Sequence, residues 1–198
     1  MKYNSLIIIP TYNEAENIEA VIKKVIDLED KNDILVIDDN SPDGTSKIVE
    51  NQKNIYNNRV FLIKREKKSG LGSAYKAGFK WALKNNYSYI FEMDADMSHD
   101  PNEIKNLKIQ LSQNKYDVVV GSRYINGVSV VNWPLSRIFL SYFANLYVRI
   151  ITGMPIKDAT SGFVGYTKNA LNSIELSEIK FNGYAFQIEM KFKLWKKN

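Results

Sequence analysis

The sequence predicts an α/β fold in which a mostly parallel sheet is covered by helices on both faces. Three observations lead to this prediction. Short apolar runs recur along the first half of the chain, amphipathic stretches with helical spacing separate them, and polar residues follow the runs. Strands that alternate with helices form parallel sheets of this kind. With 198 residues, the chain has the length of a single domain.

Four apolar runs in the first half are the expected strands. The runs are largely continuous, which is typical of strands buried on both faces. They cover 6–9, 34–37, 60–63 and 89–93. The stretches after them place apolar residues three and four positions apart, as a helix with one buried face does. These helical stretches are 18–26, 48–55, 74–82 and 104–111.

Local signals indicate where two of these helices begin. Asn13, followed by Glu16 three residues later, resembles a capping pair for the first helix. Asp100 and Pro101 predict the start of the fourth helix, because proline suits the first helical position.

The second half of the chain changes character. We expect a strand at 118–120, a helix from Trp133 to about Thr152, a strand at 162–166 and a final helix over 184–197. The helix from Trp133 is apolar or aromatic nearly all round, which allows either a buried core helix or a helix at a membrane interface. Aromatic side chains are enriched at membrane interfaces, so the interface position is the favoured interpretation.

Composition excludes several classes of protein. The absence of cysteine excludes a disulfide scaffold, a thiolate zinc site and a cysteine nucleophile, and the single histidine excludes a site with two imidazoles. The net charge of +5 favours anionic partners, but no nucleic-acid-binding pattern is present. There is no signal-peptide pattern, and no apolar run approaches the ~20 residues that span a bilayer. We therefore expect a soluble or peripheral intracellular protein. Together with the interface position favoured for the helix after Trp133, this predicts a cytoplasmic protein that associates peripherally with the cytoplasmic face of a membrane.

Acidic residues follow two of the expected strands. Asp94 and Asp96 come directly after the fourth strand, and Asp38 and Asp39 end the second. Ligands of open α/β sheets bind outside the carboxyl ends of the strands, so these residues are expected on one rim. Mg²⁺ and Mn²⁺ prefer oxygen ligands, and Mg²⁺ commonly joins one or two carboxylates to substrate phosphates. Asp94 and Asp96 are the candidate metal ligands. Of the other two aspartates, Asp39 is the stronger candidate for a functional role, whereas Asp38 could instead form a hydrogen bond that caps the next turn.

Further polar and glycine residues are candidates for the same rim. Arg123 and Arg137 are candidate phosphate ligands because guanidinium presents a planar fork of donors, with surface or ion-pair roles as the alternative. His99 invites the role of a general base, but a loop histidine that shapes the site through hydrogen bonds is favoured. Gly70 and Gly72 could hold phosphate through backbone N–H groups at a helix start, although close packing is favoured.

Seven motifs occur in a fixed order along nearly the whole chain. They cover 9–14, 37–45, 65–72, 93–101, 121–124, 160–163 and 183–190. In this order they resemble the family 2 glycosyltransferases with the GT-A-type fold. The acidic segment 94–101, which reads DADMSHDP, favours the mannosyl branch. The chain is therefore most similar to the dolichol-phosphate (polyprenol-phosphate) mannosyltransferases.

The resemblance implies a metal-dependent, inverting transfer of mannose from GDP-mannose to dolichyl or polyprenyl phosphate, with Mg²⁺ or Mn²⁺ as the cofactor. We expect one catalytic domain with a donor-binding half, 1–115, and an acceptor-binding half, 116–198. Members of the family continue past the last helix into a strand and a basic loop. The second half, which ends at Asn198, is therefore expected to be short relative to the family.

The resemblance also assigns roles to residues. Asp94, Asp96 and Ser98 are placed at the metal, with Ser98 acting through water. Asp96, Arg123 and Arg137 are the catalytic candidates, and Arg137 is the one that meets the lipid phosphate. The donor-binding candidates, which surround the nucleotide and its diphosphate, are Pro10, Tyr12, Glu14, Ile37, Asp39, Asp94, Ala95, Asp96 and Arg123.

Two alternatives stay open at this point. The first is a related enzyme that uses UDP-glucose or another nucleotide sugar. The second is a non-catalytic subunit that binds a nucleotide sugar or a lipid. The expected partners are the nucleotide sugar, the polyprenyl phosphate and a membrane surface, with a membrane-anchoring subunit as a further candidate.

Overall fold

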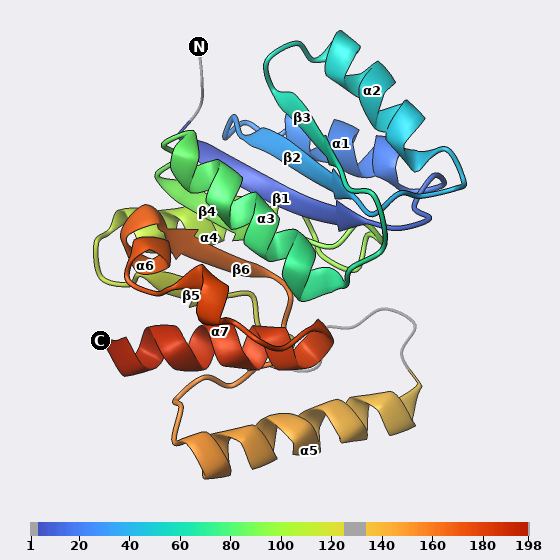
Figure 1. Cartoon of the computed structure of the whole chain (residues 1–198). Coiled ribbons are helices and arrows are strands. Elements are labelled where there is room, and N and C mark those ends of the chain that lie inside the picture. The colour runs from blue at the N-terminus through green and yellow to red at the C-terminus, as the bar shows by residue number, and fades with distance from the viewer. Residues whose placement is uncertain (1–3, 125–133, 198) are drawn as a thin grey trace.

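A six-stranded sheet forms the centre of the molecule (Figure 1). The computed structural model describes residues 4–124 and 134–197, apart from the side chain of Arg137. The strands are β1 Ser5–Thr11, β2 Asp33–Asp38, β3 Val60–Lys64, β4 Tyr89–Glu92, β5 Val118–Val120 and β6 Val164–Thr167. Their order in the sheet is β3-β2-β1-β4-β6-β5. The pairs β3–β2, β2–β1 and β1–β4 are parallel, whereas β6 is antiparallel to β4 and β5, so the predicted mostly parallel sheet is confirmed.

Helices cover both faces of this sheet. Successive side chains of a strand point to opposite faces. Leu6 and Ile8 of β1 accordingly pack with α3, α6 and α7, while Ile7 and Ile9 pack with α1, α2 and α4. The helices are α1 Ile18–Ile26, α2 Thr45–Ile55, α3 Leu71–Lys84, α4 Glu103–Ser112, α5 Leu135–Thr152, α6 Lys168–Asn172 and α7 Gly183–Lys197, with a 3₁₀ turn at Leu176–Glu178. Because both faces are covered, the strands read as continuous apolar runs.

The start of α1 corrects one prediction. The helix begins at Ile18, and Asn13 does not pair with Glu16 to cap it. Asn13 has a φ of 60°, and its backbone N–H donates to a side chain in the loop after β2. The carbonyl of Glu14 accepts from the N–H groups of Asn17 and Ile18 instead. Asparagine tolerates the left-handed region, so here it serves the turn after β1 rather than the helix.

The close approach of α3 to the sheet depends on Gly78. A Cβ atom at this position would lie 2.7 Å from Ile8 Cγ2 and 3.0 Å from Ile37 Cδ1. Any side chain would therefore push the helix away from β1 and β2, at a cost of about 1–3 kcal/mol for overpacking. The glycine lets the middle of α3 pack directly against β1 and β2.

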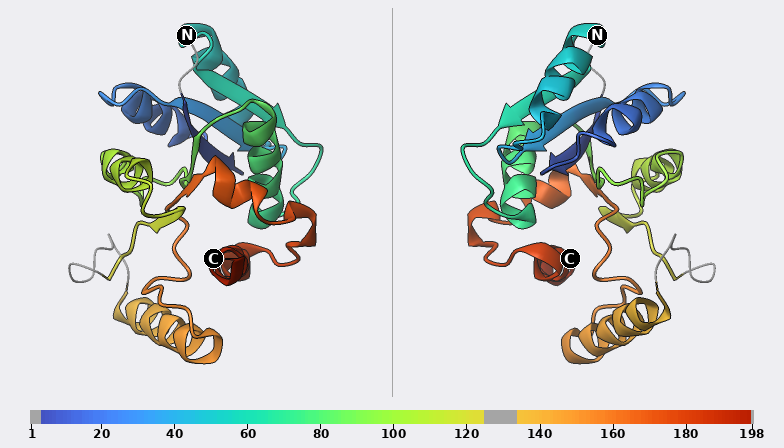
Figure 2. Two further views of the ribbon diagram at one scale, coloured as in Figure 1. Left: turned by 90° about the vertical axis from the view of Figure 1, so that its left-hand side faces the viewer. Right: turned by 90° about the vertical axis from the view of Figure 1, so that its right-hand side faces the viewer.

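α5 stands apart from the sheet, on the far side of α7 in Figure 1 and separate from the other helices in both views of Figure 2. Its aromatic side chains are exposed: Phe139 by 61%, Tyr142 by 53% and Phe143 by 60%. The interpretation of this segment as a core helix is therefore wrong. Trp133, where the helix was expected to begin, lies outside the described residues. Within the described ranges, no helix is long and apolar enough to cross a membrane.

The carboxyl ends of β1, β2 and β4 meet at one edge of the sheet. Thr11 ends β1, Asp38 ends β2, and Asp94 follows β4 by two residues. Thr11 Oγ1 donates to Asp38 Oδ1 at 3.0 Å, which ties two of these ends together. Parallel α/β sheets bind their ligands at this edge.

Candidate active site

A pocket of about 250 Å³ opens at the carboxyl edge of the sheet. Its walls come from the ends of β1 and β2, the start of α3 and the acidic loop after β4. The lining residues are Pro10, Thr11, Tyr12, Glu14, Asp39, Lys68, Gly70, Leu71, Ala74, Asp94, Ala95 and Asp96. Most of the predicted donor-binding residues are therefore brought together. Ile37 and Arg123 are the two that do not line this pocket.

The side chain of Ile37 lies in the core. It is fully buried in the layer that β2 shares with α3. Ile37 is one residue before the end of β2, and its side chain points to the face of the sheet that α3 covers. The predicted donor contact of Ile37 therefore cannot come from its side chain.

Asp38 holds the turn after β2. Its carboxylate accepts hydrogen bonds from the hydroxyl groups of Thr11 at 3.0 Å, Ser41 at 2.6 Å and Ser46 at 2.6 Å. Burial acts to raise the pKa of Asp38, but the hydrogen bonds from Ser41 and Ser46 outweigh it and the pKa lies below its usual value. These contacts join the end of β1, the turn after β2 and the start of α2, so the structure agrees with the alternative role of Asp38, in which it shapes the turn.

Two basic side chains of the motif 65–72, neither with a predicted role of its own, belong to this site. Arg65 forms a two-bond ion pair with Asp39, from Nε to Oδ1 at 2.5 Å and from Nη2 to Oδ2 at 2.6 Å. Its Nη1 also donates to Ser73 Oγ of α3 at 2.7 Å. Lys68 Nζ lies 3.8 Å from the centroid of the Tyr12 ring, a cation–π contact at the pocket wall. Arg65 and Lys68 lie in the basic run 59–68, whose composition is typical of a solvated surface. Their contacts with the site are therefore seen only in the folded chain.

Gly70 and Gly72 have packing roles. Gly70 has a φ of 89°, a region that side chains rarely adopt. A Cβ atom on Gly72 would lie 2.8 Å from the carbonyl oxygen of Phe181 and from the ring of Phe186. The segment at the start of α7 therefore lies directly against the start of α3, and this close contact agrees with the favoured interpretation.

The loop after β4 presents Asp94 and Asp96 to the pocket. His99 Nδ1 accepts from the backbone N–H of Asp94 at 3.1 Å, and Asp96 Oδ1 accepts from the N–H of Ser98 at 2.9 Å. Met97, between the two bonds, has a φ of 60°, which costs roughly 1 kcal/mol for such a residue. The two hydrogen bonds therefore hold a strained turn in which both carboxylates stay at the rim.

His99 shapes this loop. Its ring stacks on Phe163, with 4.9 Å between the ring centroids. Burial lowers the pKa of His99 to about 4, so the ring is neutral at neutral pH. Because Nδ1 accepts a hydrogen bond from the Asp94 N–H, that nitrogen is already engaged. The geometry agrees with a positioning histidine rather than a general base.

Asp94 and Asp96 suit a divalent cation that is shared with a phosphate-bearing ligand. Burial raises the pKa of Asp94 to about 6, and the negative charge of Asp96 adds to this effect. A cation between the carboxylates would relieve that repulsion. In the described part of the chain, no group of three or more acidic, histidine or cysteine side chains is placed to hold a metal alone. Mg²⁺ commonly combines one or two carboxylates with substrate phosphates, and these residues fit that arrangement. Ser98 lies in the same turn.

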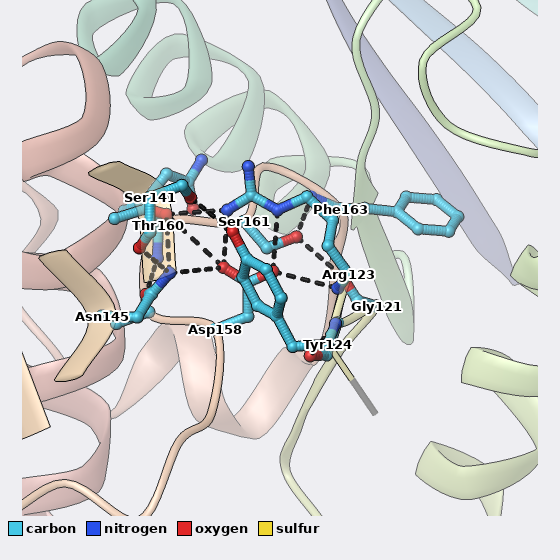
Figure 3. Close-up of polar contacts among 12 residues, drawn as sticks. Gly121, Arg123, Tyr124, Ser141, Asn145, Asp158, Thr160, Ser161 and Phe163 are labelled. Carbon is cyan, nitrogen blue, oxygen red and sulfur yellow. Dashed lines mark hydrogen bonds and ion pairs between the residues drawn. The ribbon is translucent and has the colours of Figure 1, made fainter. Parts of the chain in front are cut away.

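Arg123 is held beside the pocket by a buried carboxylate (Figure 3). Its Nε donates to Asp158 Oδ2 at 2.8 Å, and its Nη2 donates to Asp158 Oδ1 at 2.6 Å and to Thr160 Oγ1 at 2.7 Å. A Cβ atom on Gly162 in the same loop would lie 3.5 Å from Asp94 Oδ2. The loop that holds Arg123 therefore lies against the acidic loop, and the positive charge of Arg123 acts to lower the pKa of Asp94.

α5 joins this network through Asn145. The Asn145 Nδ2 group lies 3.4 Å from both Asp158 Oδ1 and Thr160 Oγ1, and Asn145 Oδ1 accepts from the Thr160 N–H at 3.3 Å. Asn145 is buried, whereas most of the helix is exposed. Arg137, predicted to meet the lipid phosphate, lies in the first turn of α5, and its side chain is outside the described part of the structure.

Comparison with known proteins now identifies the family. The sequence model for "Glycosyl transferase family 2" matches residues 6–175. The chain belongs to this family. The polyprenol monophosphomannose synthase of Mycolicibacterium smegmatis is 42% identical over 189 residues, which cover 96% of this chain and 71% of that protein. The dolichol-phosphate mannosyltransferase of Pyrococcus furiosus is 39% identical over 181 residues, covering 88% of this chain and 49% of that protein. The chain is thus a glycosyltransferase.

Solved structures share the fold. The glucosyl-3-phosphoglycerate synthase of Mycobacterium tuberculosis, in complex with Mn²⁺ and UDP-glucose, matches with a TM-score of 0.71 and 17% identity over 98% of this chain and 64% of that one. A mannosyltransferase of Pyrobaculum calidifontis, in complex with GDP-Man and Mn²⁺, matches with a TM-score of 0.60 and 16% identity over 96% of this chain and 52% of that one. The chain thus spans less than two thirds of either solved chain. This likeness confirms the expected GT-A-type fold.

We expect Asp94→Asn to stabilise the metal-free protein at neutral pH. The pKa of Asp94 is raised from 3.8 to about 6 on folding. A carboxyl group of this kind contributes its stability below its unfolded pKa and loses it as the pH rises through the folded pKa. The amide does not ionise, so it avoids that loss. Thermal unfolding in EDTA should give a Tm gain for the variant that is smallest at pH 4 and largest at pH 7. A gain that does not vary with pH would contradict the assignment.

Proposed function

We propose that the protein transfers mannose from GDP-mannose to the phosphate of a polyprenyl or dolichyl phosphate, with inversion and with Mg²⁺ or Mn²⁺. The observation behind this proposal is that Arg123 shares a rim with Asp94 and Asp96, which open into the pocket. Relatives that are 39–42% identical support the sugar and the lipid, because they are named polyprenol monophosphomannose synthase, undecaprenyl-phosphate mannosyltransferase and dolichol-phosphate mannosyltransferase.

The first half of the chain, 1–115, supplies the donor site in this proposal. Tyr12, Glu14 and Asp39 face the nucleoside, and Asp94 and Asp96 face the diphosphate. A divalent cation, when bound there, neutralises charge on the departing diphosphate. The support for this half is that the pocket is lined by residues of the first half only.

The acceptor needs no protein base. A phosphate monoester has a second pKa near ~6, so it is already an anionic nucleophile at neutral pH. One phosphate oxygen forms a bond to the anomeric carbon as the bond from that carbon to the diphosphate oxygen breaks, and the nucleoside diphosphate leaves with the electron pair. Attack from the face opposite the diphosphate gives a β-linked product from an α-linked donor. Burial lowers the pKa of His99 to about 4, which makes its ring a weak base, in agreement with a scheme that transfers no proton.

Arg123 positions the acceptor phosphate. Two anionic substrates repel each other, and a fixed cation between them reduces that repulsion and orients the nucleophile. Because Asp158 and Thr160 hold its guanidinium, Arg123 is placed before the substrate arrives. The second half, 116–198, is the acceptor half, with Arg137 of α5 as a further phosphate ligand.

α5 rests on the membrane surface in this proposal. Its exposed aromatic and aliphatic side chains form the type of surface that inserts at the headgroup boundary. Lys196 and Lys197 at the end of α7 add attraction to anionic lipids. This position brings the rim near the depth of a lipid phosphate. A membrane-anchoring partner subunit stays a prediction.

Transfer is tested with a panel of nucleotide sugars, Mn²⁺ and farnesyl phosphate as acceptor. We expect GDP-mannose to give a mannosyl phosphate product and UDP-glucose to give none. Product from UDP-glucose alone would favour the related glucosyltransferase, because the fold also occurs with that donor. Donor binding without turnover of any donor would favour the non-catalytic subunit.

Two alanine variants complete this test. Asp96→Ala should abolish transfer and the Mn²⁺ dependence of GDP-mannose binding, because its carboxylate lines the pocket. Asp100→Ala is the control, because it removes an exposed carboxylate of the same segment that does not line the pocket. This variant should retain both transfer and the Mn²⁺ dependence of GDP-mannose binding.

Serine substitutions on α5 test the membrane surface. We expect Phe139→Ser with Phe143→Ser to weaken sedimentation with anionic liposomes, because both rings are exposed on one face of the helix. Loss of a buried phenylalanine costs roughly 3–5 kcal/mol, whereas these changes should leave the melting temperature nearly unchanged. Ile55→Ser at the end of α2 is the control, because that side chain is 66% exposed and α2 lies far from α5 (Figure 1). Unchanged liposome binding in the double variant would refute the interface position.

A further inference from the structure

A lysine of α7 is buried, and among the described residues no carboxylate forms an ion pair with it. Lys191 is 1% exposed, although lysine is rarely buried unless it is paired. Its Nζ donates to the carbonyl oxygens of Ser161 at 2.8 Å and Ala159 at 3.1 Å. Nζ is also 3.1 Å from Gln187 Oε1 and 3.3 Å from the Gln187 carbonyl oxygen. The ammonium group therefore fastens α7 to the loop 158–161.

The two loop carbonyl groups that accept from Lys191, those of Ala159 and Ser161, flank Thr160. Thr160 and Asp158 are the residues that accept hydrogen bonds from the Arg123 guanidinium. Ser161 is fixed a second time, because its Oγ donates to the carbonyl oxygen of Gly121 at 2.8 Å. The backbone of this loop is thus held on one side by α7, while its side chains hold the arginine on the other.

Gln187 extends the same contacts to the acidic strand. Its Oε1 accepts from Lys191, and its Nε2 donates to Glu92 Oε2 at 2.5 Å. Glu92 is fully buried in β4, two residues before Asp94, and also accepts from the Tyr166 hydroxyl at 3.2 Å. An amide suits this place because one end donates and the other accepts. α7 therefore connects the strand that carries Asp94 with the loop that holds Arg123.

We propose that Lys191 is a positioning residue for the acceptor phosphate, because it fixes the loop that aims Arg123 at that phosphate. This inference rests on the proposed function, in which Arg123 binds the acceptor. Burial acts to lower the pKa of Lys191, while the negative charges of Glu92 and Asp158 act to raise it. Methionine in its place would fill similar space but would leave the carbonyl groups of Ala159 and Ser161 without their donor.

The test compares Lys191→Met with Lys193→Met in binding measurements. Lys193 lies on the same helix, is partly exposed and donates to the Glu178 carbonyl oxygen at 3.0 Å. With Mn²⁺ present, Lys191→Met should raise the Kd of farnesyl phosphate roughly tenfold and change the Kd of GDP by no more than about twofold. Lys193→Met should change neither. An equal loss of affinity for both ligands, or an unchanged affinity for farnesyl phosphate, would overturn the inference.

A double-mutant cycle separates positioning from general destabilisation. If Lys191 acts through Arg123, Lys191→Met should add little further loss of farnesyl phosphate binding in an Arg123→Ala background. The same loss in both backgrounds would contradict the inference. Because these are binding measurements, absence of transfer by the wild-type chain would contradict the proposed function alone.

Hydrogen exchange of the wild-type protein decides the case if Lys191→Met does not fold. Binding couplings are reciprocal, so a ligand at Arg123 stabilises what holds Arg123 in place. Farnesyl phosphate should therefore slow amide exchange in the loop 158–161 and around residues 187–191 of α7. Protection of the loop without any protection of α7 would overturn the inference.

Discussion

The arrangement of the second half depends on the ion pair between Arg123 and Asp158. Asp158 is fully buried, and a buried carboxylate is tolerated when it is paired and hydrogen-bonded. Removing one partner of such a pair typically costs about 3–5 kcal/mol. The pair joins the turn after β5 to the loop 158–161, and Asn145 brings α5 to the same carboxylate. One interaction thereby sets the places of a guanidinium, a loop and an exposed helix.

The rim arranges opposite charges before any substrate arrives. Asp94 and Asp96 repel each other at the pocket, which raises the pKa of Asp94 together with burial. Arg123 is held by the neighbouring loop, and Lys68 lines the pocket over the ring of Tyr12. Cations that are fixed beside a carboxylate pair suit a reaction between two anions, because the main barrier there is electrostatic and not the removal of a proton.

The sequence predicted the features that consecutive residues encode and missed those that depend on distant pairs. The alternation of apolar runs with helical stretches was sufficient to predict the parallel strands, and the acidic residues after two of these runs indicated the rim. Arg65 and Lys191 could not be found this way, because they pair with residues 26 and 32 positions away. Ile37 matched a motif, yet its side chain faces the core. The aromatic residues of α5 favour an exposed helix at a membrane interface, but its apolar pattern also fits a core helix, and the exposed side chains in the folded chain distinguish the two.

In the proposed function, a nucleoside diphosphate at Asp94 and Asp96 and a lipid phosphate at Arg123 lie side by side on one rim. Calorimetric titration of farnesyl phosphate into the chain saturated with GDP and Mn²⁺ distinguishes two adjacent sites from one shared site. We predict that farnesyl phosphate binds while GDP stays bound, and that Asp158→Asn weakens the binding of farnesyl phosphate but not that of GDP. Competition, in which GDP excludes farnesyl phosphate, would contradict this placement, because the two ligands would then share a single site.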